Sequence, residues 1–284
     1  MTKNNQSVAK ALQIIEIMAQ ANGPMRLQDI SVRLGLPAST VIRFLGTLTE
    51  FHYVSQNQET LQYALTMKFC RLGHLVSSQV RIRDVARPHL VRLAERFGES
   101  ASLAVEEERN VLYVDCVDGP DHILQTLQKI GRVAPMHSTG VGKLLLMNYT
   151  DSELEDYINV RGLDPSTKNT ITSRQSLIRE LKKIAKSDSA VDNEECEIGV
   201  KCVAAPLRDY TNRIVAAMSM SGPVSRMTEK KMEEIRQGLS AAAEQISVAL
   251  GYVDNPETRP RMTAVNADSS RRNSKAQPAG RGSR

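Results

Sequence analysis

The stretch LQDISVRLGLPASTVIRFLGTL, residues 27–48, decides how the first part of this chain folds. Its apolar residues recur every three or four positions, a spacing typical of amphipathic helices. Gly35 and Pro37 interrupt that spacing. We therefore expect a short helix over residues 27–34, a turn at Gly35, and a helix that begins at Pro37 and runs to residue 51. Two helices joined by so short a turn are typical of a helix-turn-helix.

The segments on either side extend this motif. Apolar residues at intervals of three and four predict another helix over residues 7–21, which Gly23 and Pro24 end. The segment HYVSQNQETLQYAL, residues 52–65, predicts two short strands joined by a polar turn near Asn57. Three helices followed by a hairpin form a winged helix-turn-helix, which we assign to residues 1–66.

The second helix of such a pair lies in the major groove of DNA, so its first turns need short polar groups and a cation. Ser39, Thr40 and Arg43 have these properties and these positions. The two hydroxyls can bond to phosphates or base edges, and Arg43 lies one turn further on the same face. The alternative is that Ser39 and Thr40 only cap an ordinary helix.

The rest of the chain predicts an α+β fold. Residues 67–87 read as a linker helix, and a further helix follows Pro88. Residues 88–252 then alternate between strand and helix patterns and form a second domain. We expect strands near residues 101–105, 111–116, 123–128, 200–204 and 214–219, and helices near residues 141–147, 151–158, 173–186 and 228–250.

Charge is unevenly distributed over the 284 residues, whose formal net charge is +5. Residues 1–85 and the final residues 254–284 each carry an excess of four positive charges, whereas residues 86–253 are mildly acidic. Basic ends favour contact with a polyanion. Residues 253–284 are poor in apolar side chains and rich in Asn, Ser, Pro, Gly and Arg, so we expect a disordered basic tail.

The sequence lacks the apolar runs of a signal peptide or a membrane-spanning helix, which predicts a cytoplasmic protein without membrane contact. Its four cysteines are scattered and do not form a disulfide pattern. We therefore expect free thiols.

The stretch DNEECEIGVKC, residues 192–202, gathers carboxylates and two thiols, which suits a metal site, a nucleophilic enzyme or a ligand pocket. Cys196 and Cys202 are too far apart for the tight turn of a zinc site, so we expect no metal and no other cofactor. An enzyme could use Cys202 as nucleophile with His137 and Asp192, although the sequence does not fix their geometry. The segment HSTGVGK, residues 137–143, departs from a nucleotide-binding P-loop at its first glycine.

Taken together, LQDISVRLGLPASTVIRFLGTL, HSTGVGK, DNEECEIGVKCVAAP and AAMSMSGP resemble the IclR family of bacterial transcriptional regulators, in that family's order and spacing from residue 7 to residue 250. The resemblance implies a winged helix followed by a GAF-like effector-binding domain with a mixed or antiparallel sheet, in a dimer or tetramer. It also implies that the effector contacts fall on Gly140, Val141, Asp192, Cys202, Ser219 and Ser221.

The resemblance further implies a DNA-binding transcriptional regulator, a repressor of catabolic genes, with no catalytic residues. Its partners would be double-stranded operator DNA, a second copy of itself, and a small metabolite. The amides at the start of a helix suit a carboxylate in that metabolite, while Asp192, Ser219 and Ser221 can bond a hydroxyl or a protonated group. The rival hypothesis is a cytosolic enzyme that depends on Cys202 and uses its N-terminal helices for protein interaction.

Overall fold

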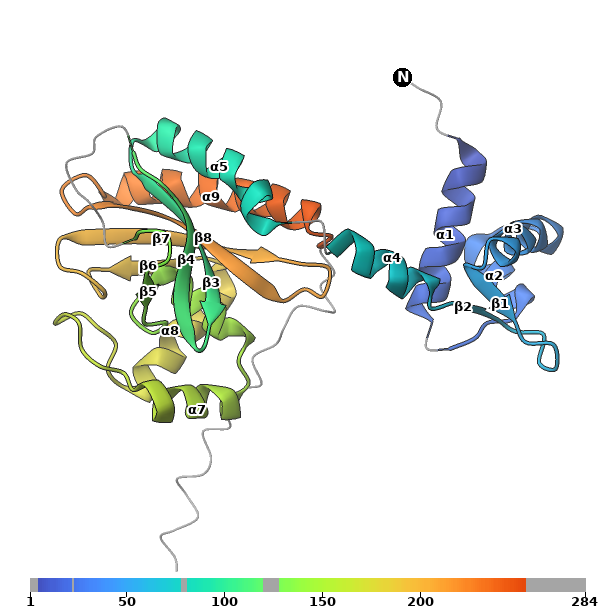
Figure 1. Cartoon of the computed structure of the whole chain (residues 1–284), viewed down its shortest axis with the longest axis horizontal. Helices are drawn as coiled ribbons and strands as arrows, with labels where there is room; N and C mark the ends of the chain where they lie inside the picture. The colour runs from blue at the N-terminus through green and yellow to red at the C-terminus, as the bar shows by residue number, and fades with distance from the viewer. Residues whose placement is uncertain (1–4, 22, 78–80, 120–127, 254–284) are drawn as a thin grey trace, which may run out of the picture. The chain divides into compact units, whose positions relative to one another are not determined.

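The computed structural model describes residues 5–21, 23–77, 81–119 and 128–253. The chain divides into two compact units, Met1–Val80 and Arg81–Arg284, which are described separately below (Figure 1). None of the described helices is long and apolar enough to cross a membrane.

The first unit contains the predicted helices α1 (Gln6–Gln20), α2 (Leu27–Leu34) and α3 (Ala38–Glu50), followed by α4 (Lys68–Ser77). Asn5 caps α1 by accepting hydrogen bonds from the Ser7 and Val8 amides. Gly35 ends α2 in the left-handed conformation, with φ of 63°, which glycine adopts without a steric penalty. The predicted turn at Gly35 is confirmed.

The predicted hairpin is also present in this unit. Strands β1 (Val54–Gln56) and β2 (Tyr63–Leu65) pair antiparallel, with Val54 opposite Leu65. The Asn57 side chain accepts hydrogen bonds from the Glu59 and Thr60 amides and so shapes the turn. The hydrophobic core lies between the helices and the hairpin, and it consists of Ile14, Met18, Met25, Ile30, Val41, Leu45, Leu48, Val54 and Tyr63.

The linker helix predicted over residues 67–87 is wrong at its end. Arg81 has an extended backbone, with φ of −94° and ψ of 114°, and the new helix α5 (Ile82–Phe97) begins after it. Pro88 lies inside α5 and does not start a helix. A proline disfavours a helix interior, but α5 buries Ala86, Leu90 and Leu93, and this packing outweighs the missing hydrogen bond.

A six-stranded antiparallel sheet forms the centre of the second unit, in the order β5-β4-β3-β8-β7-β6. The strands are β3 (Ser100–Glu107), β4 (Asn110–Val117), β5 (Val133–Ala134), β6 (Ala190–Asn193), β7 (Val200–Arg208) and β8 (Ile214–Pro223). The sequence did not predict β5 and β6, the short strands at the two edges. Most of the predicted strand at residues 123–128 lies outside the described residues, and Gln128 itself is not in a strand.

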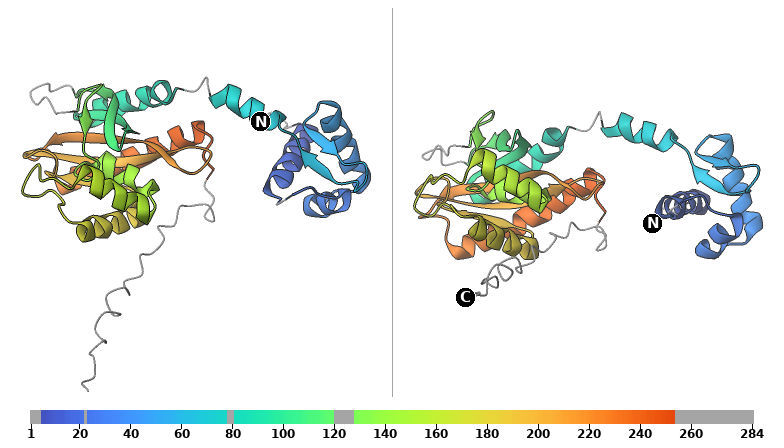
Figure 2. Two further views of the ribbon diagram at one scale, coloured as in Figure 1. Left: turned by 60° about the horizontal axis from the view of Figure 1, so that its bottom comes forward. Right: turned by 90° about the horizontal axis from the view of Figure 1, so that it is seen from below.

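Helices cover both faces of this sheet (Figures 1 and 2). On one face, α5 and α9 (Glu229–Ala249) lie side by side over a core that includes Leu103, Val203 and Met218. The other face packs against α6 (Gly140–Leu145), the short 3-10 helix η1 (Leu146–Asn148), α7 (Asp151–Arg161) and α8 (Arg174–Ser187). The predicted α+β fold is confirmed, and the sheet is antiparallel. The tail predicted at residues 254–284 lies outside the described residues.

Candidate functional site

Helix α3 presents the residues that we predicted to contact DNA. Ser39 and Arg43 are exposed and Thr40 is partly exposed, whereas Val41, Leu45 and Leu48 face the core. The helix begins at Ala38 after Pro37, and it has no side-chain capping hydrogen bond. The alternative that Ser39 and Thr40 act as caps is therefore wrong, and both hydroxyls stay available to a partner.

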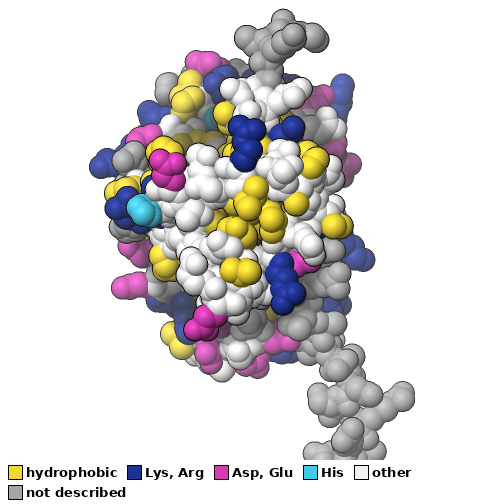
Figure 3. Space-filling view, turned by 90° about the vertical axis from the view of Figure 1, so that its right-hand side faces the viewer, with side chains coloured by type: hydrophobic (Ala, Val, Ile, Leu, Met, Phe, Trp, Pro, Cys, Tyr) yellow, Lys and Arg dark blue, Asp and Glu magenta, His cyan; other side chains and the backbone are white. Residues whose placement is uncertain are grey.

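The exposed surface is not uniformly cationic. Figure 3 views the molecule from the right-hand side of Figure 1 and shows hydrophobic side chains gathered near the centre of that face, with Lys and Arg side chains beside them. On α3 itself, Ile42 is 47% exposed and directly precedes Arg43. Apolar groups can contact thymine methyls and arginine can bond to guanine, so α3 carries both kinds of group that read a major groove.

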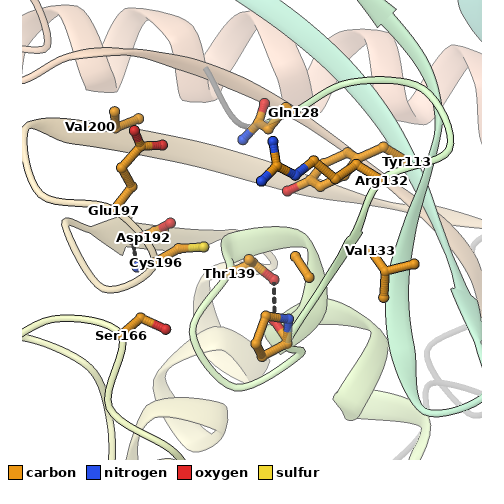
Figure 4. A pocket seen from close by; sticks show the side chains of 12 residues that line it. Tyr113, Gln128, Arg132, Val133, Thr139, Ser166, Asp192, Cys196, Glu197 and Val200 are labelled. Carbon is orange, nitrogen blue, oxygen red and sulfur yellow. Dashed lines mark hydrogen bonds between the residues drawn. The ribbon is translucent and has the colours of Figure 1, made fainter. Parts of the chain in front are cut away.

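The second unit contains a cavity of about 210 Å³. Its wall comes from β4, the segment that leads into α6, the loop before α8, and the stretch from the end of β6 to the start of β7 (Figure 4). In this view the Arg132 guanidinium and the Gln128 amide lie on one side, and Asp192, Cys196 and Glu197 lie on the other. The remaining lining residues are Tyr113, Val133, Ala134, Pro135, Thr139, Ser166 and Val200.

Asp192 is the predicted site residue that lines this cavity. It lies at the end of β6 and is 6% exposed. Its Oδ1 accepts hydrogen bonds from the Glu195 amide at 2.7 Å and the Cys196 amide at 3.3 Å. Burial raises the pKa of Asp192 to about 7, against the opposing effect of the Glu195 amide bond. The cavity therefore contains a carboxyl group that can be protonated near neutral pH.

The other predicted contact residues lie close to Asp192 but behind the cavity wall. Strand register places Asp192 opposite Cys202, and Cys202 opposite Ser221. The Gln128 amide, which does line the cavity, donates a 2.7 Å hydrogen bond to Ser221 Oγ. Ser219 Oγ lies 2.8 Å from Ser102 Oγ, a residue that the sequence did not single out. The structure thus brings these polar groups together, with Gln128 between Ser221 and the cavity.

The start of α6 fits closely against the same strands. A Cβ on Gly140 would lie 3.3 Å from the Ala204 Cβ and 3.6 Å from the Cys202 sulfur. Thr139 caps α6 by accepting a hydrogen bond from the Gly142 amide, and it also lines the cavity. Gly140 and Val141 are buried and are not part of the cavity wall. Gly140 and Val141 directly follow Thr139 in the chain, so their packing against the strands helps to hold Thr139 in the cavity wall.

A bulge in β4 separates two environments along one strand. The register against β3 shifts at Val114, because Tyr113 pairs with Ala104 while Asp115 pairs with the adjacent Leu103. Tyr113 therefore faces the cavity, and Asp115 faces α5, where Arg87 donates to its Oδ1 at 2.5 Å. Sequence reasoning missed Tyr113, since the alternating strand pattern does not reveal a bulge.

The contacts of Cys202 and His137 do not favour the nucleophilic enzyme. Burial raises the pKa of the Cys202 thiol to about 12, so it stays protonated at neutral pH. His137 contacts the Tyr157 hydroxyl at 3.1 Å and the Asp164 carbonyl at 3.2 Å. Among the described residues, no group of three or more His, Cys, Asp or Glu side chains could hold a metal ion.

Comparison with known proteins gives one consistent result across the chain. Residues 7–58 match the IclR helix-turn-helix domain, and residues 74–248 match the C-terminal domain of the bacterial transcriptional regulator IclR. The chain is 33% identical to the HTH-type transcriptional regulator XynR of Escherichia coli K12 over 247 residues, which are 87% of this chain and 98% of XynR. It is 32% identical to KdgR of the same organism over 262 residues, which are 90% of this chain and 98% of KdgR.

Solved structures agree with this match. The Thermotoga maritima IclR structure is 33% identical, with a TM-score of 0.58, and covers 87% of this chain and 99% of its own. The Agobacterium tumefaciens repressor BlcR has a TM-score of 0.71 at 21% identity, covering 89% of this chain and 100% of its own, and shows the shared fold. The chain belongs to the IclR family of bacterial transcriptional regulators.

Proposed function

We propose that this protein is a cytoplasmic repressor of catabolic genes whose binding to operator DNA is modulated by a small carboxylate in the cavity of the second unit. The observation that carries this proposal is the cavity itself. Arg132 is the cation in its described wall, which also contains the hydroxyls of Thr139 and Ser166 and the amide of Gln128. A guanidinium binds a carboxylate through charge-assisted hydrogen bonds, which are stronger than neutral ones.

Asp192 provides a second group that can bind a ligand carboxylate. Because burial raises its pKa to about 7, the protonated carboxyl can donate a hydrogen bond to a ligand oxygen. Ser219, Ser221 and Cys202 would then act behind this wall and Gly140 and Val141 beneath it, and Gln128 is the group through which Ser221 meets the cavity. A cavity of about 210 Å³ suits a compact metabolite.

DNA recognition is assigned to α3 in the first unit. Ser39, Thr40 and Arg43 would contact the operator, since they share the exposed part of the helix that a helix-turn-helix places in the groove. One winged helix contacts too few bases for a selective site, so the active form is a dimer or tetramer of this chain. The effector acts by binding one arrangement of the oligomer better than another.

The test compares Arg132→Ala with Lys182→Ala, which removes an exposed cation from α8. Binding of lactate, gluconate and benzoate is measured by calorimetry. Release of a DNA fragment from upstream of the gene that encodes this protein is measured by mobility shift. A hydrogen bond to a charged group contributes about 1.5–3 kcal/mol, so Arg132→Ala should weaken carboxylate binding about tenfold or more. The proposal fails if wild-type protein binds none of these acids, or if Arg132→Ala and Lys182→Ala bind them equally.

A further inference from the structure

A lysine without solvent exposure lies beneath the cavity wall. Lys143 is in α6 and is 0% exposed. Its Nζ donates to the Val191 carbonyl and to Glu195 Oε1, both at 2.6 Å. Taking an ammonium group out of water costs several kcal/mol, and the cost is recovered only with well-placed partners. Lys143 therefore depends on Glu195, its counter-ion.

Glu195 connects this ion pair to Asp192. Its backbone amide donates to Asp192 Oδ1 at 2.7 Å, and its carbonyl accepts a hydrogen bond from Thr170 Oγ1 at 2.6 Å. Its Oε1 also accepts a longer bond, 3.4 Å, from the Asn193 amide. The side chain and backbone of one residue thus link α6, the 166–170 segment and the end of β6 that contains Asp192.

Stability alone does not account for this arrangement. Glu195 Oε2 is buried and has no hydrogen-bond partner among the described residues. A buried ion pair with an unsatisfied oxygen is often no more stable than two well-packed apolar side chains of similar volume. Two apolar side chains could fill the space, but they could not accept a hydrogen bond from the Asn193 amide or donate one to the Val191 carbonyl in β6.

We propose that Lys143 and Glu195 are positioning residues, which hold the 192–197 turn so that Asp192, Cys196 and Glu197 form the wall of the cavity. The inference rests on the proposed function only in treating that wall as the effector site. The geometry of the turn is a property of the chain without ligand, so it is tested without ligand as well.

The experiment uses the full chain and separates stability from positioning. Lys143→Met leaves Glu195 as an unpaired buried carboxylate, so the melting temperature should fall sharply. Lys143→Met combined with Glu195→Met removes both charges, so most of that loss should be recovered. Hydrogen exchange is then measured at the Glu195 and Cys196 amides, the two donors to Asp192 Oδ1. We expect their protection to stay at least about tenfold below wild type in the double variant.

The matched control is Glu99→Met combined with Lys231→Met. This change removes another buried glutamate and its lysine partner at 2.6 Å, located where α9 meets the sheet and outside the cavity wall, and it also removes the Glu99 partner of Arg226. It should leave exchange at Glu195 and Cys196 unchanged. Gluconate binding, where wild type shows it, should fall about tenfold in the Lys143 and Glu195 double variant and stay unchanged in the control.

Two results would contradict the inference. One is a double variant that keeps wild-type protection at both amides, because the pair would then serve stability only. The other is a loss of protection in the Glu99 and Lys231 control as large as in the double variant. If wild type binds no carboxylate while the exchange results are as expected, the carboxylate proposal is wrong and the positioning role stands.

Discussion

Asp192 shows what the sequence could predict about single residues. The concentration of carboxylates and thiols in residues 192–202, with the family resemblance, identified it, and the structure places it in the cavity wall. Arg132 was missed because it follows a turn outside any regular pattern. Its place depends on Tyr113, whose amide donates to the Arg132 carbonyl and whose carbonyl accepts from the Gly131 amide. Such contacts arise from tertiary pairing and leave no local signal.

The raised pKa of Asp192 predicts how stability changes with pH. A carboxyl whose folded pKa lies above its unfolded value stabilises the protein below the unfolded pKa, and that stability is lost as pH rises through the folded pKa. For Asp192 the window runs from pH 3.8 to about 7. Asp192→Asn keeps an oxygen for the Glu195 and Cys196 amides but cannot ionise. Relative to wild type its stability should rise between pH 5 and pH 8 by roughly 3 kcal/mol at most, since about two pH units of that window lie above pH 5.

Denaturant unfolding of both proteins at pH 5 and pH 8 checks this prediction. Ser152→Ala, an exposed position in α7, is the control and should follow wild type at both pH values. If the stability difference between Asp192→Asn and wild type is the same at pH 5 and pH 8, then Asp192 does not titrate in this range.

Arg43 carries the residue-scale prediction for DNA binding. Arg43→Ala should weaken specific operator binding about tenfold or more, because a base-directed arginine contributes about 1–3 kcal/mol of discrimination. Folding and carboxylate binding should be unchanged, since Arg43 is exposed and lies in the first unit. Footprinting on the upstream DNA measures the loss. Arg179→Ala removes an equal charge from α8, so an equal loss in both variants would mean that Arg43 acts only through net charge.

At the scale of elements, a strong apolar periodicity predicted helices correctly, whereas the short strands at the edges of the sheet were not predicted. The helices of the first unit were predicted because glycine and proline mark their ends, as Gly35 and Pro37 do for α2 and α3. The edge strands β5 and β6 were missed because strands of two and four residues are too short for a pattern. The helix boundary predicted at Pro88 was wrong because proline locally favours a break, whereas the buried face of α5 keeps the helix continuous.

Helix α6 provides the prediction at this scale. A Cβ on Gly142 would lie 2.4 Å from both the Met136 Cα and its carbonyl oxygen, and 2.5 Å from Thr139 Oγ1. Gly142→Ala should therefore cost roughly 3 kcal/mol or more of unfolding free energy. Gly46 in α3 has no atom within 4 Å of a built Cβ.

Gly46→Ala should then stabilise the first unit by about 0.5–1 kcal/mol, since alanine is the better helix former. Urea unfolding followed by circular dichroism measures both variants. If Gly46→Ala lowers the free energy of unfolding as much as Gly142→Ala does, then the space around each glycine does not determine the cost of adding a methyl group.

For the whole molecule, the charge of the chain predicts a role for its last residues in DNA affinity. Residues 254–284 hold seven cations and three anions. Neutralising phosphates releases counter-ions, so deleting this segment should weaken binding to random duplex DNA and flatten its dependence on salt. Specific footprints should persist, because α3 is unchanged. Fluorescence anisotropy across a salt series measures the slope, and identical slopes for full-length and shortened chains would contradict the prediction.

The separate cores have a consequence for how such regulators diversify. The described hydrophobic cluster of the first unit ends at Leu65, and those of the second unit begin at Ile82. Each described core therefore consists of residues from its own unit. Recombination between genes near the codon for Arg81 would leave both cores complete. A regulator of this kind can therefore acquire a new effector specificity while it keeps its operator specificity, or the reverse, because neither fold has to change.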